Sequence, residues 1–87
     1  METQRELKAD FSTLVLSLAT QAAMAMGLAP NPMTNETEKD LKMACFNIDL
    51  LLMLKERTQN NLSEGEAKFL ESVIGDLQSK YLQLGKA

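Results

Sequence analysis

The chain has 87 residues, 45% of them hydrophobic, which predicts one folded domain rather than a disordered segment. Its net charge of −3 and the lack of any basic cluster exclude an electrostatic nucleic-acid binder, which needs a basic stripe to neutralise phosphates. The absence of His removes the commonest general base and most zinc-site patterns.

The charged residues 1–9 are expected to form a frayed N-terminal segment before the first helix. Ala23-Met24-Ala25 resembles a signal-peptidase site, but Glu2 and Glu6 dilute the positive region, which argues against a signal peptide. A membrane span is expected even less than a signal peptide, because a span needs roughly 20 predominantly apolar residues. The single Cys45 cannot form an internal disulfide, and a reduced thiol fits a cytoplasmic protein.

A first helix is predicted over residues 11–26, with Asp10 as its N-cap and Gly27 as the left-handed residue that ends it. Its main apolar stripe consists of Phe11, Leu14, Val15, Leu18, Ala22 and Ala25. No Asp, Glu, Lys or Arg occurs between residues 11 and 35. Because solvated helix surfaces usually carry charge, the uncharged outer face is expected to contact a partner. Its candidate contact residues are Thr13, Ser17, Thr20 and Met24. The alternative is that these polar side chains simply face water.

A second helix is predicted over residues 36–58, capped by Thr34 or Asn35, with Glu36, Glu38 and Asp40 complementing the dipole of its first turns. This helix is apolar on two opposite faces. One stripe consists of Leu41, Ala44, Cys45, Ile48, Leu51 and Leu52, and the other of Met43, Phe46, Leu50, Met53 and Leu54. A helix of a small monomer needs only one such stripe. The second stripe is therefore expected to meet the first helix, a second subunit, or both.

A third helix is predicted over residues 64–84, beginning at a capping box formed by Ser63 and Glu66 and ending at Gly85. It has one apolar stripe. We therefore expect a single helical domain over residues 10–85. The predicted fold is an all-α three-helix up-down-up bundle, or an antiparallel helical hairpin plus a third helix, which dimerises through its helices.

Asp49 is the candidate polar residue, because it lies mid-helix among apolar neighbours with no base three or four positions away. Two interpretations stay open. Asp49 is either a buried or interfacial acid that orients a partner, or an exposed acid on the flank between the two stripes.

A pattern of residues over most of the chain resembles a known family. The residues are Asp10-Phe11, Gln21-Ala22, Gly27, Pro32, Asp40-Leu41, Ala44, Ile48-Asp49, Met53-Leu54, Thr58, Asn61-Leu62, Glu66 and Tyr81. Together they resemble the bacterial domain of unknown function numbered eighteen forty-four. The chain departs from that pattern at Asn60, where the family tends to have Gly, and at Leu52, where a polar residue is common. The resemblance implies a small, cytosolic, all-helical protein and brings no catalytic residue or cofactor.

The sequence contains no catalytic, cofactor-binding or metal-binding pattern. We therefore expect a non-enzymatic interaction or structural module, a homodimer or the receiver of a helix from another protein. One alternative is a small-molecule-binding or enzymatic module with a pocket between helices, where Asp49 would meet Thr58 or Tyr81. Another is association of the first helix with a membrane surface, which its lack of basic residues argues against.

Overall fold

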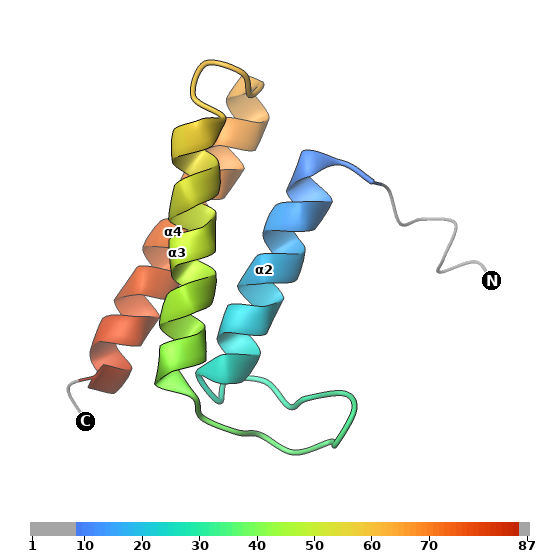
Figure 1. The fold of residues 1–87 in the computed structure, drawn as a ribbon, viewed down its shortest axis with the longest axis vertical. Helices are drawn as coiled ribbons and strands as arrows, with labels where there is room; N and C mark the ends of the chain where they lie inside the picture. Colours follow the sequence, from blue (N-terminus) through green and yellow to red (C-terminus); the bar gives the residue numbers. More distant parts are fainter. Residues whose placement is uncertain (1–8, 86–87) are drawn as a thin grey trace.

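The computed structural model describes residues 9–85, which form three helices and the connections between them. They are α2 (Phe11–Ala25), α3 (Leu41–Arg57) and α4 (Glu64–Gly85), and each contacts the other two. Consecutive helices run in opposite directions (Figure 1), so the predicted all-α, up-down-up bundle is confirmed. The expected fraying of residues 1–9 lies outside the described residues, apart from Ala9.

Two helices begin at the caps that the sequence predicts. The backbone N–H of Thr13 donates to Asp10 Oδ1 at 2.8 Å. At the start of α4, the N–H of Ser63 donates to Glu66 Oε1 at 3.0 Å, and the N–H of Glu66 donates to Ser63 Oγ at 3.2 Å. This reciprocal capping box satisfies two backbone donors that the helix itself leaves unpaired.

The C-terminus of α2 forms a Schellman motif around Gly27. Gly27 has a φ of 79°, which L-residues with a side chain rarely adopt, and its N–H donates to the Met24 carbonyl. The N–H of Leu28 donates to the Ala23 carbonyl, which completes the motif. The predicted end of the first helix is thus confirmed, with Met26 as its C-cap.

The predicted start of the second helix near Glu36 is wrong, because α3 begins at Leu41. Asp40 is the N-cap, since the N–H of Met43 donates to its Oδ1 at 3.1 Å. Asn35 does not cap a helix but adopts a φ of 59° in a tight turn, which is closed by the Asn31 N–H on the Glu36 carbonyl at 2.8 Å.

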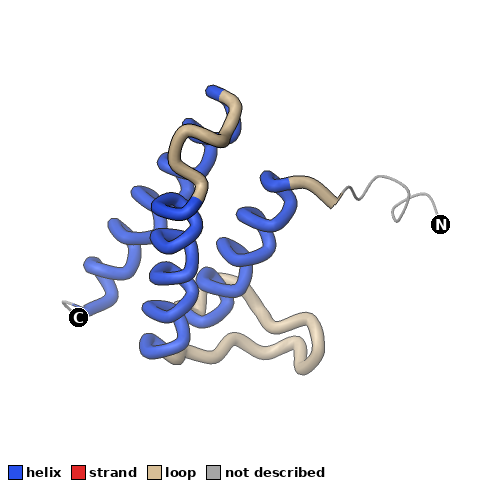
Figure 2. Tube along the Cα trace, turned by 45° about the horizontal axis from the view of Figure 1, so that its top comes forward, coloured by secondary structure: helices blue, strands red, loops and turns tan. Residues whose placement is uncertain are grey.

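Residues 26–40 therefore form a long connection that folds back on itself (Figure 2). Met26 and Lys39 form an antiparallel bridge, and the N–H of Asp40 donates to the Ala25 carbonyl at 2.6 Å. These pairings hold the two ends of residues 36–40 against other parts of the connection and the end of α2, so the acidic residues there do not begin a helix. Glu36 and Glu38 accordingly lie in the connection and not in the first turn of α3.

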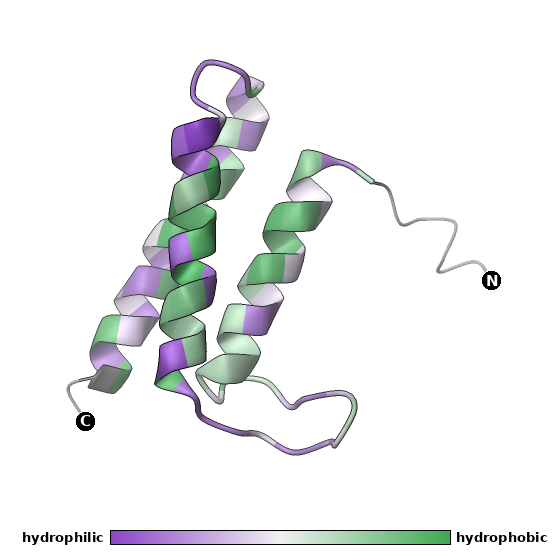
Figure 3. Cartoon of the chain, viewed as in Figure 1, coloured by the Kyte–Doolittle hydropathy of each residue, from purple (hydrophilic) through white to green (hydrophobic). Residues whose placement is uncertain are grey.

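The core draws on all three helices. Its buried hydrophobic residues are Val15, Ala22, Met26, Ala44, Ile48, Leu51, Leu70, Ile74 and Leu77. Figure 3 shows hydrophobic colouring along α2 and the middle of α3, with more hydrophilic residues along α4. The Cα trace is only 15 Å deep along its shortest axis, which allows about two helix layers. No helix of this bundle is thus enclosed on all sides.

Candidate functional site

The second apolar stripe of α3 remains largely exposed in the single chain. Met43, Phe46 and Met53 expose 48%, 55% and 44% of their surface, and Leu50 is half-buried. Spacings of three, four and three residues place these four side chains on one face of the helix. Leu54, the fifth predicted interface residue of this stripe, is also half-buried, at the edge of the bundle interior. The first stripe supplies the core residues Ala44, Ile48 and Leu51 instead.

Leu14 of α2 extends this exposed surface. Gln21 of α2 and Met43 of α3 line the same shallow cleft, so these flanks of the two helices adjoin. Leu14 lies two turns before Gln21, and Leu50 two turns after Met43. Because α2 and α3 are antiparallel (Figure 1), both steps run in the same direction along the helix pair, so the flank of α2 that carries Leu14 continues next to the flank of α3 that carries Leu50. Leu14 is 46% exposed, although helical periodicity assigned it to the core stripe.

We call this surface the α2–α3 face and define it by Leu14, Met43, Phe46, Leu50 and Met53. Its charged neighbours are confined to the margin. Helical spacing places Lys42 and Asp49 along one edge of the α3 stripe, and Arg57 at its far end. No Asp, Glu, Lys or Arg occurs in α2. An apolar centre with a charged rim is the arrangement of many protein–protein contacts.

Two of the predicted polar contact residues of α2, Ser17 and Thr20, donate their hydroxyl hydrogen bonds within their own helix. Ser17 Oγ donates to the Thr13 carbonyl at 3.0 Å, and Thr20 Oγ1 donates to the Leu16 carbonyl at 2.9 Å. Ser17 and Thr20 are exposed, whereas Thr13 and Met24 are half-buried. Because the hydroxyl donors already have acceptors in their own helix, a neighbouring molecule could cover this surface without leaving them unpaired.

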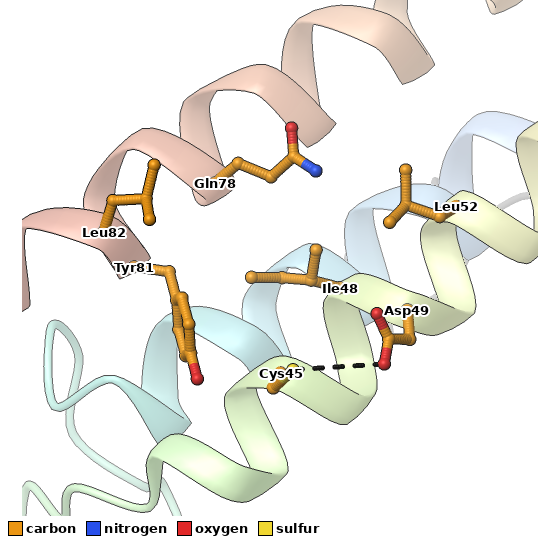
Figure 4. A pocket seen from close by; sticks show the side chains of 7 residues that line it. All are labelled: Cys45, Ile48, Asp49, Leu52, Gln78, Tyr81 and Leu82. Atoms are coloured by element: carbon orange, nitrogen blue, oxygen red, sulfur yellow. Dashed lines mark hydrogen bonds between the residues drawn. The ribbon is translucent and has the colours of Figure 1, made fainter. Parts of the chain in front are cut away.

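A separate groove lies between α3 and α4, on the opposite flank of α3 (Figure 4). It encloses a volume of about 390 Å³. Its lining residues are Cys45, Ile48, Asp49, Leu52, Gln78, Tyr81 and Leu82. The structure thus brings Asp49 and Tyr81 to one groove, as one interpretation of the sequence anticipated. It does not bring Thr58 there, because the Thr58 hydroxyl donates to the Leu54 carbonyl at 2.6 Å and ends α3.

Asp49 is exposed at the rim of this groove. The Cys45 thiol donates to Asp49 Oδ2 at 3.9 Å, a long contact even for sulfur. Tyr81 reaches from α4 toward Cys45 (Figure 4). The pKa of the Tyr81 phenol is raised, first by the charge of the neighbouring Cys45 sulfur, then by desolvation, and least by the Asp49 carboxylate. Cys45 and, more weakly, Asp49 therefore act on the Tyr81 phenol across the groove.

Among residues 9–85, no group of three Cys, Asp or Glu side chains is arranged to hold a metal ion. None of the three described helices combines the length and the hydropathy that a membrane span needs.

Sequence reasoning missed Asn47, the buried polar residue of the part of the chain that the structure describes, which is 2% exposed. Its Nδ2 donates to the Met43 carbonyl at 3.0 Å within the same helix. The signal was present in the sequence. Asn47 lies three residues after Ala44 and four before Leu51, which places it on the buried face of the helix.

The fold and the exposed surface define a class: a small three-helix protein whose central helix is covered on one side only. The chain belongs to the family described as a domain of unknown function, DUF1844, whose sequence model matches residues 8–83. The resemblance that the sequence suggested is thereby confirmed. No curated protein and no solved structure matches the chain.

Proposed function

We propose that this chain is a non-enzymatic interaction module that self-associates through the α2–α3 face. The observation that carries the proposal is the exposure of three large apolar side chains, Met43, Phe46 and Met53, on one face of the central helix. Exposed apolar residues are ordinary when they are scattered, whereas a contiguous set rimmed by charge is typical of a contact surface.

A second copy of the chain is the occupant that fits this face best. Surfaces related by a two-fold axis contact themselves, so a self-associating face must tolerate its own charges. The α2–α3 face meets this condition because its centre carries no charge and the net charge of the chain is only −3. Phe46 and Leu50 lie near the middle of the face, where residues that dominate binding usually lie.

The size of the face is adequate for a weak dimer. Helices of 15 and 17 residues are about 22–25 Å long, and two neighbours span roughly 20 Å. The resulting flat area of roughly 500 Å² per partner is below the ~800 Å² per partner of standard interfaces and falls in the range of weak or transient contacts.

The expected affinity follows from the exposed side chains. Covering the exposed half of Leu14, Met43, Phe46 and Met53 contributes roughly 1 kcal/mol for each side chain, and a symmetric dimer covers two sets. This gain of roughly 8 kcal/mol exceeds the lower end of the ~4–15 kcal/mol that association costs in lost freedom by about 4 kcal/mol, which corresponds to a Kd of about 1 mM. We therefore expect a concentration-dependent dimer rather than an obligate one.

The compartment belongs to the same proposal. Cys45 is a free, half-buried thiol, which suits a reducing cytoplasm.

Sedimentation velocity over a concentration series tests self-association directly. With a Kd of about 1 mM, wild-type protein should shift progressively from monomer toward dimer between about 50 µM and 2 mM. Phe46→Ser should remain monomeric across the series, because it removes the largest exposed apolar side chain of the face.

Leu82→Ser is the matched control, since Leu82 is 62% exposed but lies on α4, outside the α2–α3 face. It should dimerise like the wild type. Circular dichroism should show that both variants keep the wild-type helix content. If the wild type is monomeric throughout the series, the proposed self-association is wrong. If Phe46→Ser dimerises like the wild type, the α2–α3 face is not the interface.

A further inference from the structure

The groove between α3 and α4 combines one charge with apolar walls. Asp49 is the single charged side chain among its lining residues. Ile48, Leu52 and Leu82 supply the apolar walls, and Leu52 and Leu82 are themselves exposed. A volume of about 390 Å³ lies in the range of small-molecule sites and is too small for a packed helix.

Within the described residues, Asp49 has no basic partner. The ion pairs of that part of the chain join Lys68 to Glu64 and Lys80 to Asp76, both on α4. The contact that Asp49 does make is the long hydrogen bond from the Cys45 thiol. A thiol is a weak donor, so the carboxylate keeps most of its capacity to pair with a cation.

An aromatic ring lines the same groove as this carboxylate. Tyr81 projects from α4 toward Cys45, which lies between the ring and Asp49 (Figure 4). The face of an aromatic ring attracts cations, so the ring adds to the attraction of the carboxylate in the same groove. Gln78 is neutral and adds no charge that would oppose a cation.

We propose that this groove binds small organic cations, with an ammonium group at Asp49 and Tyr81 and an apolar body against Ile48, Leu52 and Leu82. Charge complementarity favours a cation, because the Asp49 carboxylate would repel an anion, and a fully apolar ligand would leave the carboxylate without a compensating charge. Asp49 borders both this groove and the α2–α3 face, whereas the other lining residues lie beyond it on α3 and on α4. The proposal rests on a different set of residues from self-association and goes beyond it.

The affinity should be low, because Asp49 is exposed and exposed ion pairs contribute little. Titrations followed by ¹H–¹⁵N NMR suit such weak binding and locate it on the chain. Three probes of nearly equal shape separate the contributions: phenethylammonium is a cation, phenethyl alcohol is neutral and hydrocinnamate is an anion. We expect phenethylammonium to bind most tightly, with amide shifts around residues 45–52 and 78–82.

Asp49→Asn should weaken the binding of phenethylammonium by about threefold to fivefold and leave that of phenethyl alcohol unchanged. Glu71→Gln is the matched control: it removes the same charge from an exposed position of α4 that does not line the groove, and the affinity should not change. Leu82→Ser should weaken both probes, because it removes apolar wall from an exposed position.

Three outcomes would overturn the proposal. The first is equal binding of the neutral and cationic probes, and the second is an equal response of Asp49→Asn and Glu71→Gln. The third concerns the source of the cation. Nα-acetyl-lysine amide carries an ammonium group without the aromatic body, so its tighter binding would identify the occupant as a protein side chain rather than a small molecule.

Discussion

The helices α3 and α4 come from one short chain and divide their surfaces differently. α4 buries Leu70, Ile74 and Leu77 on one stripe, and its outer surface carries the ion pairs from Lys68 to Glu64 and from Lys80 to Asp76. α3 buries a similar stripe and presents a second apolar one outward. The outer face of α4 thus presents charge to water, whereas the outer face of α3 presents the apolar side chains of Met43, Phe46 and Met53. In a bundle this thin, folding alone does not cover both faces of the central helix, and the proposed self-association rests on this difference.

If α3 and α4 differ on their outer surfaces only, their inner faces contribute equally to the core. Substitutions in the core test this and should have the largest effect on the free energy of unfolding. Leu51 of α3 and Leu70 of α4 are almost fully buried. Leu51→Ala and Leu70→Ala should each lower the free energy of unfolding by about 2–5 kcal/mol, through lost burial and the cavity left behind. Urea denaturation followed by circular dichroism, at a concentration where the protein is monomeric, measures both.

Leu82→Ala is the control for these two substitutions, because Leu82 is exposed on α4. It should change the free energy of unfolding by less than about 0.5 kcal/mol. A loss below about 1 kcal/mol for Leu51→Ala would mean that the inner side of α3 does not belong to the core, and the contrast with α4 would then have no basis.

The N-caps sharpen the comparison with a smaller effect. The side chain of Asp40 caps α3, and Ser63 caps α4. Asp40→Ala and Ser63→Ala should each lower the free energy of unfolding by about 1 kcal/mol, because each leaves a backbone N–H without its acceptor. Asp40→Ser keeps a capping oxygen and should remain within a few tenths of the wild type.

The Asp40 result also distinguishes the two possible starts of the helix. Had the helix begun at Glu36, Asp40 would lie inside its second turn, and Ala would raise helix propensity there. Stabilisation by Asp40→Ala would therefore contradict a start at Leu41, whereas destabilisation agrees with the capping hydrogen bond to Met43.

The same two helices show what the sequence could and could not predict. The start of α4 was predictable because Ser63 and Glu66 form a local capping box that needs no tertiary contact. The start of α3 was not, because residues 36–40 are held out of the helix by pairings with distant residues, such as Lys39 with Met26. The acidic residues before Leu41 resemble the first turn of a helix. The turn closed by Asn31 and the Met26–Lys39 bridge keep them outside it.

The candidate surfaces divide in a similar way. Spacing along α3 was sufficient to place Met43, Phe46 and Met53 on one face, and they are exposed together. The sequence assigned Leu14 to the core, because helical periodicity locates the centre of an apolar stripe but not its width. In the structure Leu14 lies at the margin of the α2 stripe and is exposed. The meeting of Asp49 with Tyr81 depends on how α4 crosses α3. The sequence could suggest this pair but could not choose it over Asp49 with Thr58.

The smallest expected effect is a shift in the pKa of Tyr81, which lies in the groove between α3 and α4 and responds to the neighbouring Cys45 and Asp49. Tyr81 is the only tyrosine of a chain without tryptophan, so tyrosinate absorbance during a pH titration follows this phenol alone. Its pKa should lie above that of the unfolded chain in denaturant, mainly because of Cys45. Cys45→Ala should bring the midpoint back toward the ordinary value, and Asp49→Asn should move it less in the same direction.

The sign for stability follows from the same shift. Because the pKa of Tyr81 is raised in the folded chain, the native state holds its proton more tightly than the unfolded state does. This stabilisation is fully present below about pH 10 and is lost as the pH rises through the folded-state pKa. The free energy of unfolding should therefore fall more steeply above about pH 10 in the wild type than in Tyr81→Phe. If Cys45→Ala leaves the pKa of Tyr81 unchanged, the phenol does not lie next to the thiol. The proposed cation site would then lose its aromatic wall.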